Sequence, residues 1–438
     1  MTDPFDLLGR ALSDLDCRSP GARITAVGGA SVTVEGFGRL PRLGDRLRVL
    51  TPAAAVMAEV VKLDEKRVEA IVEGTTAGLH VGQTVAHVGR PRLRPGDHWI
   101  GRVVDPDGAP LDGRPLLPGA EAVEVRRDPP AAHGRRGFGP RLSTGVAALN
   151  TVLPLVRGQR IGIFAGSGVG KSTLLGNLAR GVEADVIVIA LVGERGREVQ
   201  DFVANVLGPE GMARSVLVAA TSDRAPQVRR RCAQTATAVA EHFRDRGQQV
   251  LLLIDSVTRF CEAHREVTVA AGETANLRGH PASTAGMVAH LCERAGPGTA
   301  EMGDITAIYT VLVAGSDMEE PVADMLRGVL DGHIVLSREI AERGQFPAID
   351  VPRSVSRSLP DAANRAENET IREVRRALSL HAESEMMIRA GLYQAGSDPA
   401  LDHAVAIKEQ LDAFLSIIDK CTPEIHFRQL RKALSESR

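Results

Sequence analysis

Residues 160–181 read RIGIFAGSGVGKSTLLGNLARG, which is an apolar run, a glycine-rich turn and a helix-like segment in succession. A phosphate-binding loop needs this order, because the backbone N–H groups of the turn surround a phosphate and the dipole of the following helix adds positive charge. The ammonium group of Lys171 can reach the β- and γ-phosphates of a nucleotide, and the hydroxyl of Ser172 can ligate Mg²⁺. The motif usually opens with Gly, where this chain has Ala165. We therefore predict a P-loop for a nucleoside triphosphate, formed by Gly166, Ser167, Gly168, Val169, Gly170, Lys171, Ser172 and Thr173.

Apolar runs of strand length alternate with helical patterns from about residue 150 to residue 350. Runs that are apolar on both faces are typical of buried parallel strands. Because helix-length segments join them, they predict a mostly parallel sheet with helices on both sides. The runs are RIGIFAG (160–166), DVIVIALVGE (185–194), SVLVAATSD (215–223), QVLLLIDS (249–256) and ITAIYTVLVAG (305–315), and AIDV (348–351) is the last strand signal.

Two acidic residues end apolar runs downstream of the P-loop. Asp255 closes QVLLLID, and a carboxylate at the end of a strand that neighbours the P-loop strand can hold a Mg²⁺-bound water. Glu194 closes VIVIALVGE, where a carboxylate one water away from the γ-phosphate can orient the attacking water and accept its proton. Arg195 and Glu198 follow in GERGREV (193–199); they could position Glu194 and the Mg²⁺ shell, or form surface ion pairs. We predict Glu194 as the group that aligns the water, and the metal ligands as Ser172, Asp255 and Glu198.

The regions on either side of this core have different patterns. Residues 22–90 carry short alternating stretches broken by Gly, Pro and Asp, which favours a small β-barrel or β-sandwich. Before them an apolar stripe at helical spacing predicts either a helix packed on its own barrel or a docking helix for a partner; it consists of Phe5, Leu8, Leu12 and Leu15. A Pro- and Gly-rich connector at 126–141 is expected to be irregular, and the segments after Pro360 are helical. We predict the boundaries of these regions at 1–20 for the N-terminal helix, 21–92 for the β domain, 93–360 for the P-loop domain and 361–438 for the helical C-terminal domain.

The composition limits the partners and the location of the protein. Its 438 residues are 43% hydrophobic and 25% charged, and 53 Lys and Arg against 55 Asp and Glu give a formal net charge of -2. A protein whose main task is to hold nucleic acid is expected to be strongly basic, and 3% aromatic residues leave few stacking platforms. No apolar run reaches the ~18 residues that span a bilayer, and MTDPFDLLGR lacks the apolar core of a signal peptide. The five cysteines (17, 232, 261, 292 and 421) contain no CxxC pair, which disfavours a disulfide framework or a zinc site. We expect a folded cytoplasmic protein that binds no nucleic acid.

Several motifs, in this order, resemble the catalytic subunits of rotary ATP synthases and their relatives. They are GRVVDPDGAPLDG (101–113), GSGVGKST (166–173), GERGREV, LLLIDSVTRF (251–260), VLVAGSDMEEPVADMLRGVLDGHIVLSREIAERGQFPAID (311–350) and SVSR (354–357), so the resemblance covers about residues 20 to 420. The phrases most similar to the ATPase of the bacterial flagellar export apparatus are RGQRIGIFAGSGVGKSTLL (157–175), DSVTRFCEAHRE (255–266) and LYQAGSDPALDHAV (392–405). The ATPase of the type III secretion injectisome shares nearly all of them. RGHPAS (278–283) departs from the pattern, because the family more often has a proline-rich segment with an aromatic residue there.

The resemblance implies a RecA-like α/β P-loop core with an N-terminal β-barrel and a C-terminal helical domain. It also implies a homohexameric ring with Mg²⁺ and ATP at the subunit interfaces. Glu194 and Lys171 match catalytic residues of the family, and Arg195 matches a nearby active-site arginine. Arg357 matches an arginine that is supplied across the interface to the γ-phosphate, where it accelerates hydrolysis by about 10³–10⁵. Tyr393 lies in a segment that resembles one near the base pocket, although it could equally be a core aromatic residue between helices.

The resemblance further implies ATP-driven export of flagellar proteins by a cytoplasmic ATPase that is peripheral at the inner membrane. The implied partners are a regulatory stator-like export protein bound by the N-terminal stripe, a central stalk-like export protein, the membrane export gate, chaperones and exported flagellar subunits. Two other classes remain open. A rotary ATP synthase subunit would need a sibling non-catalytic subunit. A ring-shaped RNA translocase of the transcription-terminator type would need a basic, aromatic-bearing N-terminal domain, whereas residues 20–95 contain one aromatic residue, Phe37.

Overall fold

The computed structural model describes residues 21–39, 41–51, 55–277, 279–313 and 318–435. The predicted partner-binding helix at 1–20 therefore lies outside the described residues. The chain divides into two compact units. Within the described ranges, no helix is both long enough and apolar enough to cross a membrane.

Six antiparallel strands close into a barrel in the N-terminal unit. Around the barrel the strands are β1 (Ala22–Val27), β2 (Ser31–Glu35), β5 (Arg67–Val72), β4 (Val56–Leu63), β3 (Arg46–Val49) and β6 (Thr84–Gly89). Successive side chains of a strand point to opposite faces, so β2 buries Val32 and Val34 and leaves their neighbours partly exposed. Apolar side chains fill the interior: Ala22, Ile24, Val32, Val34, Leu47, Val49, Ala58, Val60, Val68, Ala70, Val72 and Val85. Of the two folds that the sequence allowed for this region, the structure has the barrel.

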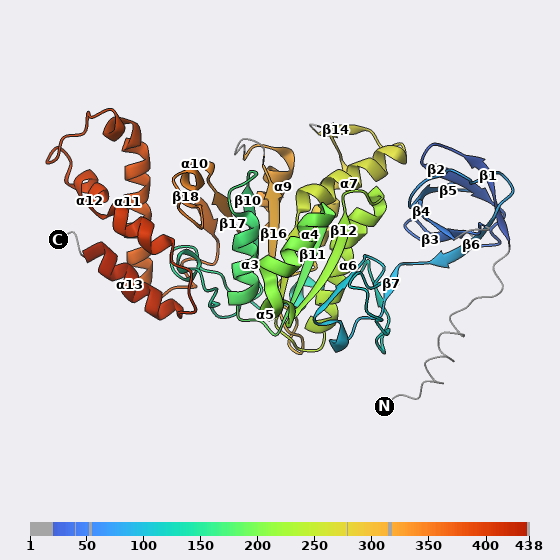
Figure 1. Cartoon of the computed structure of the whole chain (residues 1–438), viewed down its shortest axis with the longest axis horizontal. Helices are drawn as coiled ribbons and strands as arrows, with labels where there is room; N and C mark the ends of the chain where they lie inside the picture. Colours follow the sequence, from blue (N-terminus) through green and yellow to red (C-terminus); the bar gives the residue numbers. More distant parts are fainter. Residues whose placement is uncertain (1–20, 40, 52–54, 278, 314–317, 436–438) are drawn as a thin grey trace. The chain divides into compact units, whose positions relative to one another are not determined.

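An eight-stranded sheet forms the centre of the second unit (Figure 1). Its order is β18 (Ile349–Ser356), β17 (Gly332–Leu336), β10 (Arg160–Ala165), β16 (Ile305–Leu312), β13 (Val250–Asp255), β11 (Val186–Glu194), β12 (Ser215–Thr221) and β8 (Arg102–Val104). All neighbours are parallel except β17 and β18. Consecutive residues of β13 are all buried, so both faces of the sheet are covered. The predicted fold class is confirmed.

Helices and short elements connect these strands. Around the sheet lie α2 (Ala147–Asn150), α3 (Lys171–Gly181), α4 (Gly196–Asp201), the π-helical turn η3 (Phe202–Leu207), α5 (Gly208–Met212), α6 (Pro226–Arg244), α7 (Val257–Ala270), α8 (Ser283–Glu293), α9 (Pro321–Val329) and α10 (Arg338–Glu342). The small elements are β7 (Arg92–Leu93), η1 (Asp97–Trp99), β9 (Val123–Glu124), η2 (Ala132–Gly134), β14 (Ala275–Leu277) and β15 (His280–Pro281). The atypical RGHPAS stretch thus contributes one strand to the antiparallel pair β14–β15.

Three helices complete the chain, α11 (Arg365–Arg389), α12 (Pro399–Leu415) and α13 (Pro423–Ser435). At the start of α11, the Asn364 side chain accepts from the Glu367 N–H, and the Glu367 carboxylate accepts from the Asn364 N–H. This reciprocal capping box fixes where the helix begins.

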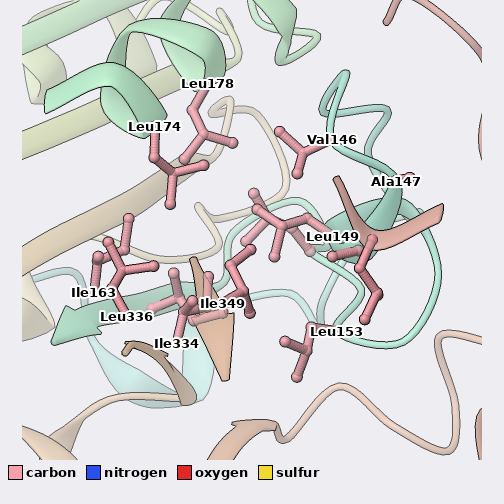
Figure 2. Close-up of a cluster of buried hydrophobic side chains, with 14 of the residues drawn as sticks. Val146, Ala147, Leu149, Leu153, Ile163, Leu174, Leu178, Ile334, Leu336 and Ile349 are labelled. Atoms are coloured by element: carbon pink, nitrogen blue, oxygen red, sulfur yellow. The ribbon is translucent and has the colours of Figure 1, made fainter. Parts of the chain in front are cut away.

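Apolar side chains from several elements meet where α2 and α3 pack beside β10 and β17 (Figure 2). Leu174 and Leu178 of α3 lie over Ile163 and Ile334, and Leu149 of α2 packs into the same cluster. The cluster continues into the buried faces of the C-terminal helices. It therefore holds the helix that follows the P-loop against the strand that precedes it.

Candidate active site

The glycine-rich turn joins β10 to α3 in the conformation that its glycines permit. Gly168 has a φ of +78° and Gly170 a φ of +85°, which side chains with a Cβ rarely adopt. Val169 is buried between them and anchors the turn, while Ser167, Gly168, Ser172 and Thr173 are exposed. Gly170 is the N-cap of α3, so the first N–H groups of the helix have no intrahelical acceptor. The turn presents these donors and the exposed hydroxyl of Ser172 to solvent, as an anion-binding helix end requires.

Lys171 and Asp255 meet although their strands are not neighbours. The Lys171 Nζ lies 2.5 Å from the Asp255 Oδ1, and both side chains are largely buried. The adjacency of the two strands, on which the interpretation of Asp255 was conditional, is not present, because β16 is inserted between β10 and β13. From β16, Thr310 donates its hydroxyl to the same Asp255 Oδ1 over 2.7 Å. Thr310 is thus a site residue that the sequence analysis missed, and its only signal is a polar residue within the apolar run ITAIYTVLVAG.

Glu194 lies at the end of β11, directly beside β13. Burial, the charge of Asp255 and a hydrogen bond with Glu198 raise the pKa of Glu194 to about 7. The same hydrogen bond lowers the pKa of Glu198. A carboxylate with a pKa near neutrality is well matched to accept a proton from water at cellular pH. Glu194 is therefore the more easily protonated of the two carboxyl groups, and its role as the base stays a prediction.

Two arginines surround this acidic pair. Arg195 is the N-cap of α4, and its largely exposed guanidinium lies 3.6 Å from Glu198. Arg259 of α7 donates to Glu262 over 2.8 Å, and the charges of Glu262, Glu194 and Glu198 raise the pKa of Arg259. Arg259 lies in LLLIDSVTRF, and it was not among the residues predicted for the site. An arginine one helical turn beyond Asp255 was the signal for it.

Arg357 lies at the other end of the sheet from the P-loop of its own chain. Its N–H donates to the Asp331 carbonyl, and the Asp331 N–H donates to the carbonyl of Arg160, the first residue of β10. The P-loop follows the last residue of β10, so the length of that strand, roughly 17 Å at about 3.3 Å per residue, separates the two features. The exposed Arg357 side chain therefore cannot reach a γ-phosphate bound at Lys171 of the same chain.

The aromatic residue on the P-loop is Phe346 rather than Tyr393. A Cβ added at Gly170 would lie 3.1 Å from the Phe346 ring, whose residue is 45% exposed. The ring thus offers an open apolar face beside the loop. Tyr393 is half-buried in the connection between α11 and α12 and donates its hydroxyl to Asp402 over 2.6 Å. It is not a core aromatic residue, and its place in a base pocket stays a prediction. Phe346 belongs to the family-like stretch 311–350, and an aromatic residue directly before Pro347 was its sequence signal.

The donors at the P-loop suit a magnesium ion. Ser172 and Asp255 supply a hydroxyl and a carboxylate, the hard oxygen ligands that Mg²⁺ prefers. The remaining predicted ligand, Glu198, bonds instead to Glu194 and accepts from the Arg195 N–H over 3.5 Å. Its assignment to the metal therefore stays a prediction, whereas its contact with Glu194 is a feature of the structure.

A second set of potential metal ligands lies within the described part of the chain, away from the P-loop. Ligand atoms of Asp419, Cys421 and His426 lie within 4.8 Å of one another. The Asn150 Oδ1 accepts from the N–H and the hydroxyl of Thr144, so the Asn150 amide N–H donates to the His426 Nδ1. The proton of neutral His426 therefore sits on Nε2, 3.0 Å from Asp419, and that nitrogen has no lone pair for a metal. The group ties α13 to α2 by polar contacts.

Comparison with known proteins identifies the family of the chain. Residues 145–356 match the model of the ATP synthase alpha/beta family, nucleotide-binding domain, and residues 363–432 match the T3SS EscN ATPase C-terminal domain. The chain is 46% identical to the flagellum-specific ATP synthase of Treponema pallidum, over 90% of this chain and 88% of that protein. It is 44% identical to the SPI-2 type 3 secretion system ATPase of Salmonella typhimurium, over 87% and 88%.

The solved structures agree with these relatives. The assembled ATPase EscN of the enteropathogenic E. coli type III secretion system superimposes with a TM-score of 0.87 at 38% identity. The match covers 94% of this chain and all of that chain. Since the fold, the phosphate loop and the relatives agree, the chain belongs to the flagellar and type III secretion ATPases of the ATP synthase alpha/beta family, and it is an ATPase.

Proposed function

We propose that the chain hydrolyses Mg²⁺-ATP as a homohexameric ring and so energises export of flagellar proteins through a type III secretion apparatus. The observation that carries the proposal is the separation of Arg357 from the P-loop of its own chain. The P-loop end of the sheet holds the other predicted catalytic groups, Lys171, Asp255 and Glu194. An arginine in that position acts on a phosphate only if another copy supplies the phosphate. A head-to-tail ring brings the two ends of neighbouring subunits together.

The reaction begins with ATP bound in the P-loop. The N–H groups of the turn and the Lys171 ammonium hold the β- and γ-phosphates, so Lys171 exchanges its contact with Asp255 for the phosphate. Ser172 and Asp255 would hold Mg²⁺, and the bound ion would supply positive charge beside the phosphates. Thr310 keeps the Asp255 carboxylate in place through its hydroxyl.

Hydrolysis needs a base and a compensating charge. The Glu194 carboxylate orients the water and accepts its proton as the water oxygen bonds to the γ-phosphorus and the bond to ADP breaks. Glu198 accepts a hydrogen bond from Glu194 once Glu194 has taken the proton of the water, and Arg195 and Arg259 lie beside the pair. Arg357 of the neighbouring subunit places its guanidinium on the transferring phosphoryl group. We assign the adenine to the open face of Phe346, because an exposed ring beside a P-loop suits base stacking.

Protein concentration tests this proposal directly. The ATPase rate per chain of the wild type is expected to rise steeply as the ring assembles, while Arg357→Ala assembles but loses about 10³-fold or more in kcat. Light scattering on the same samples gives the oligomeric state. A monomer that hydrolyses ATP at full speed, or an Arg357→Ala protein with wild-type kcat, would refute the in-trans site.

The division into regions remains part of the proposal: a partner-binding segment at 1–20, a barrel domain at 21–92, an ATPase domain at 93–360 and a helical domain at 361–438. EscN has been solved in complex with its central stalk EscO, which supports a stalk-like partner for this chain. We further propose a cytoplasmic location at the inner membrane export gate, with chaperones and exported flagellar subunits as partners.

The N-terminal stripe is proposed to bind a regulatory stator-like export protein. Removal of residues 2–18 is then expected to weaken capture of that protein in a pull-down, while the monomer keeps its nucleotide affinity. Undiminished capture by the truncated chain would contradict the assignment.

An injectisome ATPase is the second candidate, because the SPI-2 ATPase is as similar to this chain as several flagellar relatives are. The two differ in cargo. Deletion of the gene in its own bacterium is expected to remove flagellin from the culture medium. Normal flagellin with loss of a secreted effector would favour the injectisome.

A further inference from the structure

Two buried serines flank Arg357. Ser356 and Ser358 are 7% and 5% exposed, and both hydroxyls bond to the carbonyl of Pro154, over 2.7 and 3.3 Å. The two hydroxyl oxygens are also 2.9 Å apart. The backbone is therefore held to one carbonyl on both sides of Arg357, while the Arg357 side chain stays exposed.

Gln159 connects this pair of serines to the sheet. The residue is fully buried, and its Nε2 donates to the Asp331 carbonyl over 3.1 Å and to the Ser356 hydroxyl over 3.0 Å. Its Oε1 accepts from the Val156 N–H over 3.1 Å. Every polar atom of the side chain is thus paired. A buried polar network that is fully paired allows one arrangement, because any displacement leaves a donor or acceptor without a partner.

Asp331 provides the second fixed point. Its carbonyl accepts from both Gln159 and the Arg357 N–H. Its carboxylate accepts from the Arg160 Nε and Nη2, over 3.0 and 3.1 Å, so the residue cannot rotate freely. The Arg357 Nη2 in turn donates to the Arg327 carbonyl at the end of α9 over 3.1 Å. Helix carbonyl ends attract cations, so this contact directs the guanidinium.

We propose that Gln159, together with Ser356 and Ser358, positions Arg357 for its action on the nucleotide of the neighbouring subunit. We call these three residues the arginine anchor. The inference rests on the proposed in-trans role of Arg357 and extends it to residues that contact neither substrate nor neighbour. A misplacement of a catalytic group by about 1 Å can cost about 10²-fold in rate, so the anchor controls kcat without contributing to ATP binding.

The test compares kcat and KM of the full-length protein at concentrations where light scattering shows the ring. Gln159→Leu removes the amide and keeps a buried side chain, and Ser356→Ala with Ser358→Ala removes the hydroxyls with little change of volume. Each is expected to lower kcat by about tenfold or more, with KM and the affinity for a fluorescent ATP analogue within about twofold. Each is also expected to have no further effect on kcat when Arg357→Ala is already present, because groups that act as a unit are not additive.

Gln234→Leu is the matched control. Gln234 is a buried residue on α6 whose amide group bonds to Met287 and Arg126. The adjacent Thr235 donates to the Pro106 carbonyl just after β8, and β8 and β18 form opposite edges of the sheet, so Gln234 lies far from Arg357. It should keep kcat near that of the wild type. Losses that add to those of Arg357→Ala, or kcat unchanged in both anchor variants, would overturn the positioning role. If Arg357→Ala itself keeps full kcat, the in-trans site fails, and that outcome is distinct from failure of the anchor alone.

Discussion

At the scale of single residues, the site depends on how its carboxylates differ. Asp255 bonds to Lys171 and Thr310, whereas Glu194 is partly buried next to the charge of Asp255 and shares a hydrogen bond with Glu198. These surroundings raise the pKa of Glu194 and leave it as the group whose protonation changes near neutral pH. Environments that separate the pKa values of neighbouring acids are typical of acid–base catalysis.

The pH dependence of hydrolysis should therefore follow Glu194. Its pKa is raised to about 7, so the ionised form that accepts a proton grows as pH rises through 7, and kcat/KM should rise with it. Glu194→Gln should lower kcat by about 10²–10⁴ and remove this rising limb. Rates measured from about pH 5.5 to about pH 8.5 check both points. A rising limb that persists in Glu194→Gln would assign it to another group.

Phe346 should contribute to ATP binding rather than to the chemical step. Its ring packs over Gly170 with an open face, and stacking of a base on an aromatic side chain is worth about 1–3 kcal/mol. Phe346→Ala should raise KM by about tenfold or more at nearly constant kcat, and Phe346→Tyr should restore it. Phe138 provides the control, because it has a similar exposure of 46% but lies away from the P-loop. The next residue, Gly139, donates its N–H to the Arg157 carbonyl near the start of β10, whereas the P-loop follows the end of that strand. Equal effects of Phe346→Ala and Phe138→Ala would count against stacking.

At the scale of elements, the sequence predicts the interior of the sheet better than its edges. Long buried strands such as β11 and β13 appear as apolar runs, because both of their faces are covered. β8 has three residues, and in β18 buried and more exposed residues alternate, so AIDV signalled only the start of that strand. The order of strands is not encoded in any local pattern, which explains why the insertion of β16, and with it Thr310, was missed.

The start of α11 carries a testable contribution to stability. Arg141 donates two hydrogen bonds to the Glu367 carboxylate and stacks over the Phe427 ring at 5.1 Å, and both charged side chains are mostly buried. Breaking such a pair by removing one partner is expected to cost about 3–5 kcal/mol, because the remaining charge stays buried. Denaturant unfolding of Arg141→Ala and Glu367→Ala, followed by circular dichroism, measures this cost.

A second ion pair on the same helix provides the comparison. Arg365 and Glu369 are 95% and 56% exposed and bond over 3.2 Å, so Glu369→Ala should cost at most about 0.5 kcal/mol. A double-mutant cycle should give strong coupling for Arg141 with Glu367 and little for Arg365 with Glu369. Similar coupling energies in both pairs would show that burial does not strengthen the Arg141–Glu367 pair.

At the scale of the whole molecule, the two halves of the proposed site lie at opposite ends of one chain's sheet. Family resemblance pointed to this division through SVSR, but no local pattern shows that Arg357 and the P-loop lie apart. That required the register of β17 and β18 against β10. The proposed function therefore depends on the P-loop and Arg357, which are far apart in the sequence and whose relative positions are set by the sheet.

Mixed rings test this division. Lys171→Ala and Arg357→Ala proteins should each be nearly inactive. The first lacks the ammonium group that binds the phosphates, and the second lacks the arginine that acts on the nucleotide of the neighbouring subunit. Mixed in equal amounts, about a quarter of interfaces in a randomly assembled ring would join an intact loop to an intact arginine. ATPase activity should therefore reappear on mixing and reach up to about a quarter of the wild-type value. A mixture as inactive as its components would rule out sharing of the site.

The strand β10 has one consequence for the order of events in such a ring. Its first residue, Arg160, bonds to Asp331, whose carbonyl accepts from the Arg357 N–H. Its last residue, Ala165, leads into the P-loop. One short strand, paired with β16 and β17, therefore connects the nucleotide site of a subunit to the arginine that this subunit supplies to the neighbouring subunit. Nucleotide binding at one site would then change the position of Arg357 at the adjacent site through β10 alone. Coupled rather than independent turnover, seen as a Hill coefficient that differs from one for ATP, is the behaviour expected from this linkage.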